Sequence, residues 1–327
     1  MMRIVVSKPL IGSAVSRLRE SGHDVVVLSE NHSQEAFVEA IAAGCEGVLS
    51  MLSDPIGADV IARTRAAGKS LRVISNYAVG YNNIDIKACT EAGIVVTNTP
   101  DVLTDATADI ALTLLLMAMR SIPAGMKLLS EGRFTGWRPI CLLGHDPRGK
   151  TLGILGMGRI GIAMARRGEA LGMKIIYHSR SGAKAELPWA HISFAGLLAE
   201  SDVLSIHCPL NSETKHLIGA AELEKMKRGS VLINTARGPI VDEAALADAL
   251  RTGHLFSAGL DVYEREPEVY PALMKMENVV LLPHMGSSTY ETREAMGGLA
   301  ASAILDVLAG RRPSHPVNPE VFELASL

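Results

Sequence analysis

Short runs of aliphatic and β-branched residues alternate with helical stretches along most of this 327-residue chain. In the first hundred residues the expected strands are MRIVV, DVVVL (24–28), GVLS (47–50) and LRVIS (71–75). After residue 150 a second series comprises TLGILG, MKIIYH, SDVLSIH, GSVLINT, LFSAGLDV and ENVVLLP. Strands that alternate with helices predict parallel sheets covered by helices on both faces. We therefore expect an α/β protein with two doubly wound parallel-sheet domains.

A glycine-rich turn, KTLGILGMGRIG, joins the first strand of the second series to a helical stretch. It places Gly156, Gly158 and Gly161 in a G-x-G-x-x-G pattern, which is a weak signal alone but here has the required strand before it and helix after it. The first glycine permits a tight turn, the second lets a pyrophosphate approach the backbone, and the third lets the helix pack on the strand. The helix N-terminus adds partial positive charge. This context favours a dinucleotide-binding site over a turn without ligand.

The end of the next strand indicates which dinucleotide binds. A site that prefers NAD carries an acidic residue there, which accepts from the ribose 2′-OH. This sequence instead reads KIIYHSRSGAK, with Ser179, Arg180 and Ser181, and the next carboxylate along the chain is Glu186. A guanidinium flanked by hydroxyls suits a 2′-phosphate, and Lys184 adds positive charge. The sequence predicts NADP(H) as the preferred cofactor, with NAD(H) kept as the alternative.

Three polar residues follow strand-like runs in the second series. Arg237, Glu266 and His284 lie in NTARGPIVDE, LDVYEREPE and LLPHMGSST. Because the carboxyl ends of parallel strands meet at one edge of a sheet, these side chains are expected to gather there. An imidazole titrates near neutral pH and can donate a proton, a carboxylate partner can orient it, and a guanidinium can hold a substrate carboxylate. Each residue alone has an ordinary surface explanation, but together they provide what hydride transfer to a 2-keto acid requires.

Composition and charge exclude several other classes of protein. A formal net charge of −3 gives no electrostatic surface for nucleic acid or for an anionic membrane. The first residues lack the basic and apolar regions of a targeting segment, and the longest apolar run (110–119) is too short to span a bilayer. We therefore expect a cytoplasmic protein. The cysteines have no C-x-x-C spacing, so neither a disulfide framework nor a metal site is predicted at Cys45, Cys89, Cys141 or Cys208.

The glycine pattern, NTARG, DVYEREP and PHMGSST occur in an order and spacing that resembles the D-isomer-specific 2-hydroxyacid dehydrogenase family over essentially the full chain. YHSRS and PHMGSSTYETR make it most similar to the NADPH-dependent glyoxylate/hydroxypyruvate reductases. The resemblance implies that Arg237 binds substrate and that Glu266 and His284 transfer the proton. It also implies that the backbone N–H groups of Val79 and Gly80 hold the substrate carboxylate, where a glycine permits close approach.

Further cofactor contacts follow from the resemblance. Those at the pyrophosphate and adenosine are Gly156, Met157, Gly158, Arg159, Ile160, Gly161, Ser179, Arg180, Ser181, Cys208 and Pro209. Thr235 and Asp261 are expected at the nicotinamide amide, with Thr107 as a further candidate. At the far end of the substrate we expect Leu52, Ser53, Ser288 and Arg293, for which ordinary loop positions are the alternative.

The chain is expected to fold with its dinucleotide domain as an insertion. A long helix is predicted after Pro100, and another, over TYETREAMGGLAASAILDVLAG, near the C-terminus. We therefore expect a Rossmann domain (101–290) inserted into a smaller flavodoxin-like substrate domain (1–100 and 291–327), with a hinge at the two crossings. Relatives use the helix at 104–121 in a two-fold dimer, so a homodimer is expected, with Trp137 reaching the partner's active site or serving as a packing aromatic.

The expected activity is reduction of a small 2-keto acid, glyoxylate or hydroxypyruvate, to the 2-hydroxy acid. A longer acid such as 2-ketogluconate stays open as the substrate. The competing class is a dinucleotide-sensing binding protein that keeps the same residues but acts by recruiting partners. Formate or phosphite oxidation on the same scaffold is a third hypothesis, which the Glu266–His284 pair disfavours.

Overall fold

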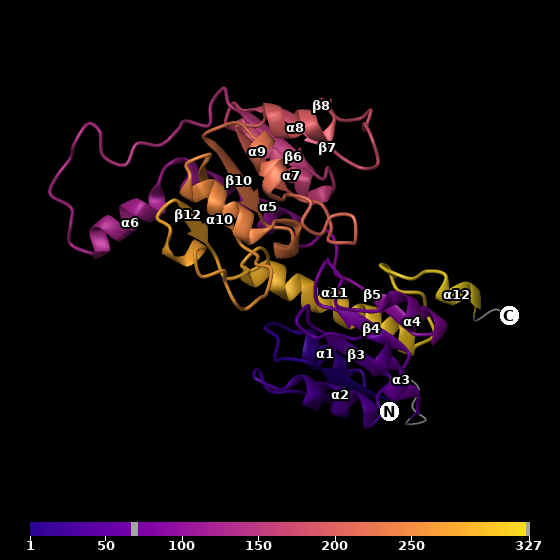
Figure 1. Cartoon of the computed structure of the whole chain (residues 1–327). Helices are drawn as coiled ribbons and strands as arrows, with labels where there is room; N and C mark the ends of the chain where they lie inside the picture. Colours follow the sequence, from indigo (N-terminus) through magenta and orange to yellow (C-terminus); the bar gives the residue numbers. More distant parts are fainter. Residues whose placement is uncertain (67–70, 325–327) are drawn as a thin grey trace. The chain divides into compact units, whose positions relative to one another are not determined.

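The computed structural model describes residues 1–66 and 71–324, and the chain divides into two compact units. Unit 1 contains Met1–Leu103 and Ser287–Leu327, and unit 2 contains Thr104–Gly286. Each unit is built on one sheet of parallel strands with helices on both faces (Figure 1). The α/β class and the two doubly wound parallel sheets expected from the sequence are therefore confirmed.

Unit 1 has a five-stranded sheet in the order β2-β1-β3-β4-β5, the order of a flavodoxin-like fold. Its strands are β1 (Arg3–Val6), β2 (Asp24–Val27), β3 (Gly47–Ser50), β4 (Val73–Asn76) and β5 (Val95–Thr97). Apolar side chains of three helices form a core with one face of the sheet: α2 (Gln34–Ala42), α3 (Ala58–Ala66) and α4 (Ile86–Glu91). Contacts on the other side involve α1 (Ala14–Glu20) and α11 (Tyr290–Leu308).

The edge strand β5 was not predicted, because its apolar run is only three residues long. The polypeptide after α11 covers this edge: Thr97 bridges Pro316, and the Val317 N–H donates to the Val96 carbonyl at 2.7 Å. The buried Asn318 side chain accepts from the Val96 N–H at 2.8 Å. Covering an edge strand in this way satisfies its backbone and prevents pairing with another chain. A short helix, α12 (Val321–Leu324), follows.

Unit 2 has a seven-stranded sheet in the order β12-β11-β10-β9-β6-β7-β8. Its strands are β6 (Thr151–Leu155), β7 (Lys174–His178), β8 (Ala190–His191), β9 (Val203–Ile206), β10 (Ser230–Asn234), β11 (Leu255–Leu260) and β12 (Val279–Leu281). Chain order reverses between β6 and β9, as in a dinucleotide-binding fold. The two-residue β8 is the one strand of this sheet that the sequence did not predict. Its extent is too short to leave a periodic signal.

Two separate apolar cores lie on the two faces of this sheet. One includes residues of α8 (Phe194–Glu200), α9 (Ala220–Lys225) and α10 (Glu243–Arg251). The other includes residues of α5 (Thr104–Met119) and α7 (Arg159–Ala170). Along each central strand the side chains alternate between the two cores, as the period of a strand requires. Short 3₁₀ turns occur at Gly238–Ile240 and Leu273–Lys275.

The helix predicted over 104–121 ends at Met119. Ser121 has a left-handed backbone, with φ 51°, and the chain then bends by 69° into α6 (Ile122–Ser130). Figure 1 shows α6 and the loop after it projecting from unit 2. Within the described residues no single helix is long and apolar enough to cross a membrane, although the bent pair α5 and α6 together meets that criterion.

Candidate active site

The turn after β6 has the shape that a pyrophosphate requires. Gly156 has φ 97°, and a Cβ there would lie 2.5 Å from the Cys208 nitrogen, so the loops after β6 and β9 touch where the strand order reverses. A Cβ on Gly161 would overlap the Gly156 carbonyl oxygen. A Cβ on Gly158, in contrast, would meet nothing within 4 Å, and no side chain caps α7. Backbone and open space at a helix N-terminus fit a dinucleotide phosphate.

The other predicted adenosine contacts border the same turn. Ser179, Arg180 and Ser181 follow β7, with the two serine hydroxyls 2.9 Å apart. Arg180 Nη1 donates to Glu213 Oε2 at 2.8 Å. A carboxylate therefore lies beside Arg180 although the local sequence contains none before Glu186. Sequence reasoning missed Glu213, since 33 positions separate it from Arg180.

Not all residues of the glycine-rich turn expose their side chains. Met157 is buried in the core beneath α5 and α7, and Ile160 packs against that core. Any contact that Met157 makes with a cofactor would therefore come from its backbone. Cys208 is partly buried, and burial raises the pKa of its thiol to about 11, so the thiol stays protonated at neutral pH.

Three neighbouring strands, β10, β11 and β12, carry the predicted catalytic residues beyond their carboxyl ends. His284 Nδ1 lies 2.8 Å from Glu266 Oε2, and the other carboxylate oxygen accepts from the Tyr263 N–H at 3.0 Å. The His284 and Glu266 side chains are each 36% exposed, so a ligand in solution can reach them. The structure thus brings the proposed acid and its orienting carboxylate into direct contact.

Arg237 acts electrostatically on this pair. Burial alone would raise the pKa of Glu266, but the hydrogen bond and charge of His284, the Tyr263 N–H and the charge of Arg237 together hold it below its ordinary value. Burial lowers the pKa of Arg237, and Glu266 opposes that shift. A guanidinium begins from so high a pKa that Arg237 stays charged at any working pH. Glu266 is thus an ionised carboxylate that interacts with both an imidazole and a fixed cation.

Asp261 anchors the turn that carries His284. Its two oxygens accept from the backbone N–H groups of Met285 at 2.6 Å and Gly286 at 2.8 Å. His284 itself has a left-handed backbone, with φ 55°. The Asp261 side chain is buried, and desolvation raises its pKa despite these donors. Asp261 was predicted at the nicotinamide amide, and the structure adds a role in positioning His284.

The other residues predicted at the amide also lie in unit 2. A Cβ on Gly286 would lie 3.3 Å from Asp261 Oδ2 and 3.5 Å from Thr107 Oγ1, so Thr107 and Asp261 flank the same glycine. The buried Thr235 hydroxyl has no hydrogen-bond partner within the described parts of the chain. A buried hydroxyl without a partner is costly unless a ligand satisfies it. These observations fit a cofactor that reaches from the glycine turn to this edge.

In unit 1, asparagine side chains hold the segments predicted to bind substrate. The Val79 carbonyl accepts from Asn98 at 2.8 Å, and the Gly80 carbonyl accepts from Asn76 at 2.8 Å. Asn83 donates to the carbonyls on both sides of Leu52 and Ser53, those of Met51 and Asp54, each at 3.0 Å. Arg293 and Ser288, also in unit 1, hydrogen bond to each other at 3.2 Å.

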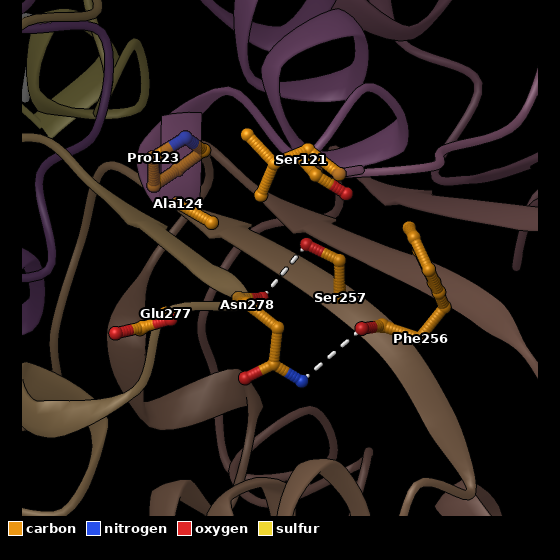
Figure 2. Close-up of a pocket in the computed structure, with 9 residues that line it drawn as sticks. Ser121, Pro123, Ala124, Phe256, Ser257, Glu277 and Asn278 are labelled. Carbon is orange, nitrogen blue, oxygen red and sulfur yellow. Dashed lines mark hydrogen bonds between the residues drawn. The ribbon is translucent and has the colours of Figure 1, made fainter. Parts of the chain in front are cut away.

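A small cavity of about 150 Å³ lies elsewhere in unit 2 (Figure 2). It opens between the start of α6 and the amino ends of β11 and β12, where Asn278 hydrogen bonds to Phe256 and Ser257. The catalytic candidates follow the carboxyl ends of the same strands. This cavity is therefore separate from the candidate active site, and its walls are Ala118, Ser121, Pro123, Ala124, Leu142, Phe256, Ser257, Glu277 and Asn278.

Comparison with known proteins agrees with this geometry. Residues 112–286 match the family model described as D-isomer specific 2-hydroxyacid dehydrogenase, NAD binding domain. The chain is 44% identical over 298 residues to a glyoxylate reductase of Korarchaeum cryptofilum, covering 89% of this chain and 88% of that protein. It is 45% identical over 329 residues to a glyoxylate reductase of Thermococcus kodakarensis, covering 98% of both.

A solved structure shares the fold over nearly the whole chain. It is an NADPH-dependent glyoxylate/hydroxypyruvate reductase from Sinorhizobium meliloti in complex with NADP and malonate. The TM-score is 0.85 at 34% identity, over 97% of this chain and 96% of that one. Fold, sequence and the arrangement of charged groups on the seven-stranded sheet lead to one conclusion. The chain belongs to the D-isomer-specific 2-hydroxyacid dehydrogenase family.

Proposed function

We propose that this protein reduces small 2-keto acids, glyoxylate and hydroxypyruvate, to 2-hydroxy acids with NADPH as the hydride donor. The observation that carries the proposal is the 2.8 Å contact between His284 and Glu266, with the charge of Arg237 acting on the same carboxylate. The relatives described as glyoxylate reductases support the substrate class. The bound nicotinamide would supply the hydride, and the residues of this chain would supply binding and the proton.

The roles of the three residues follow from their chemistry. Arg237 would bind the substrate's carboxylate and carbonyl oxygens and stabilise the negative charge that develops on the carbonyl oxygen. Because Nδ1 of His284 faces Glu266, Nε2 is the atom that would donate the proton to that oxygen. Glu266 would hold the ring in this orientation. The backbone N–H groups of Val79 and Gly80 would bind the substrate carboxylate, with Leu52 and Ser53 at its far end.

We propose NADP(H) as the preferred cofactor, because Arg180 between two serine hydroxyls suits a 2′-phosphate. The related reductase whose complex contains NADP supports this preference. The rest of the dinucleotide would be bound by the glycine-rich turn (156–161), Cys208 and Pro209. Its nicotinamide amide would lie at Thr235, Asp261 and Thr107.

We also propose a homodimer formed through the helix predicted over 104–121 together with α6 and the loop that follows it. This region exposes large apolar side chains, which partner chains commonly cover. They are Met126, Leu129, Phe134, Trp137, Ile140 and Leu143, of which Trp137 is 85% exposed. Sedimentation or light scattering would give the mass in solution, and a monomer at micromolar concentration would contradict the proposal.

The deciding experiment measures initial rates with NADPH and with NADH against glyoxylate, hydroxypyruvate, 2-ketogluconate and pyruvate. Fast reduction of glyoxylate or hydroxypyruvate with a strong NADPH preference is the expected result. Fast turnover of 2-ketogluconate alone would identify a longer acid as the substrate. Tight cofactor binding with negligible turnover of all four acids would favour the dinucleotide-sensing binding protein.

A further inference from the structure

Glu213 is a feature of the predicted adenosine site that opposes the proposed 2′-phosphate recognition. Its carboxylate accepts from Arg180 Nη1 at 2.8 Å, while the two side chains are 68% and 79% exposed. Such an exposed pair contributes little to folding stability. The ion pair instead changes what Arg180 can offer a ligand, since one edge of its guanidinium already faces a carboxylate.

The backbone around Glu213 is built to hold it in place. The Asn211 side-chain oxygen accepts from the Glu213 N–H at 2.9 Å and from the Thr214 N–H at 3.0 Å. The Thr214 hydroxyl in turn donates to the Pro209 carbonyl at 2.7 Å, and accepts from the Asn211 N–H at 2.8 Å. This loop directly follows Cys208, whose backbone touches the glycine turn at Gly156. Glu213 therefore projects from a fixed wall of the proposed cofactor site.

We propose that Glu213 is a specificity-determining residue, which limits the preference for NADPH over NADH by competing with the 2′-phosphate for Arg180. This inference depends on the proposed role of Arg180. A 2′-phosphate must either displace the Glu213 carboxylate, which breaks its ion pair with Arg180, or bind beside it, where the two like charges repel, and both cost affinity. A ribose 2′-OH is neutral and incurs no such repulsion. The carboxylate thus weakens binding of NADPH and spares NADH.

The test replaces Glu213 with Gln, which keeps the size and the acceptor oxygen but removes the charge. Calorimetric titration should show that Glu213→Gln lowers the Kd for NADP⁺ roughly fivefold to tenfold at low salt, with the Kd for NAD⁺ changed less than twofold. The KM for NADPH should fall in parallel while kcat stays constant. Glu186→Gln is the matched control, because it removes an exposed carboxylate from the 179–186 loop and should leave both affinities unchanged.

A double-mutant comparison separates this inference from the proposed cofactor. The gain from Glu213→Gln should vanish in an Arg180→Ala background, since the two residues are expected to act through one interaction. If Arg180→Ala weakens the binding of NADP⁺ alone but Glu213→Gln changes neither Kd, the inference about Glu213 is wrong and the proposed NADPH preference stands. If Glu213→Gln changes the Kd values for NADP⁺ and NAD⁺ by the same factor, Glu213 has a purely structural role. If Arg180→Ala lowers the affinity for NADP⁺ and for NAD⁺ equally, Arg180 does not bind the 2′-phosphate.

Discussion

At the residue scale, the position of Arg237 depends on the glycine that follows it. A Cβ on Gly238 would lie 1.8 Å from the carbonyl carbon of Tyr263 and 2.4 Å from the Glu264 nitrogen, so it would overlap this peptide group. Tyr263 and Glu264 lie three and two positions before Glu266. The absence of a side chain at Gly238 therefore lets the Arg237 turn pack against the segment that carries the carboxylate. Nothing in the local sequence pattern singles out Gly238, because a close approach of two backbone segments that are distant in sequence leaves no local signal.

Gly238→Ala should therefore lower kcat/KM for glyoxylate by about 10²-fold, because a displacement of about 1 Å in a catalytic group has effects of that size. Gly219→Ala is the control, since a Cβ there lies 3.6 Å from its nearest neighbours. Steady-state rates and melting temperatures of both variants would test this. Normal activity of Gly238→Ala would show that the Arg237 turn and the segment that carries Glu266 can move apart without loss of catalysis.

His284→Ala should lower kcat by about 10²- to 10⁴-fold, the usual contribution of a general acid. The Kd for NADP⁺ should remain close to that of the wild type, because the proposed role of His284 is proton donation to substrate. Stopped-flow rates together with calorimetric binding would separate the two effects. Loss of cofactor binding would show that His284 is structural.

At the element scale, the loops that follow β3 and β4 in unit 1 are joined by asparagine side chains, of which Asn76 is buried. Asn83 contacts both Met51 and Asp54, and its side chain also meets that of Asn76, which lies at the end of β4. Ser50 at the end of β3 donates to Asn76 at 3.0 Å. The network fixes the shape of both loops, including Leu52, Ser53, Val79 and Gly80, independently of their own side chains.

Asn83→Ala should raise the KM for glyoxylate severalfold and leave the KM for NADPH unchanged. The reason is that two loop carbonyls lose their donor, which costs about 1–3 kcal/mol and loosens the proposed substrate contacts. Steady-state kinetics with each substrate varied in turn would measure the two effects. An equal rise in both KM values would indicate general unfolding of unit 1 and not a loosened loop.

The same elements show what the sequence could and could not predict. Strands such as β6 and β10 are long and apolar, and His284 and Glu266 follow strands at the same sheet edge, so periodicity and motif spacing located them. The edge strands β5 and β8 are too short for a periodic signal, and the bend at Ser121 was not predicted although Pro123 marks the start of α6. Glu213 could not be paired with Arg180, because loops that are distant in sequence meet only in the folded chain.

At the scale of the whole molecule, the two units are formed in different ways from the chain. Unit 2 is continuous, whereas unit 1 combines the first 103 residues with the residues from Ser287 onward. Arg72 in unit 1 donates to the Val307 and Leu308 carbonyls at the end of α11, at 3.0 and 3.2 Å, and so ties the two parts together. Folding of unit 1 therefore requires contacts between residues more than 200 positions apart, which are slow to form.

The stability of unit 2 should depend on pH through Asp202, which joins the amino ends of its central strands. Its oxygens accept from the Thr151 N–H at the start of β6 at 2.8 Å and from Lys227 Nζ, before β10, at 3.1 Å. Burial would raise the pKa of Asp202, but these two donors outweigh it and lower the pKa below its ordinary value. A carboxylate with a lowered pKa stabilises the fold above its unfolded pKa, and this contribution is lost as the pH falls through the folded value.

Asp202→Asn should therefore lower the free energy of unfolding by about 1–2 kcal/mol at pH 7, because a charge-assisted bond becomes a neutral one. The difference from wild type should begin to shrink as the pH falls below about 4, the ordinary pKa of an Asp carboxyl, because protons then bind the unfolded chain before they bind the folded one. Urea unfolding at a series of pH values would measure it, with Asp248→Asn as the control. Asp248 pairs with Arg251 at an exposed site, with side chains 72% and 67% exposed. Asp248→Asn should therefore leave the free energy of unfolding almost unchanged at every pH. A difference for Asp202→Asn that stays constant down to pH 3 would exclude titration of this carboxylate as its source.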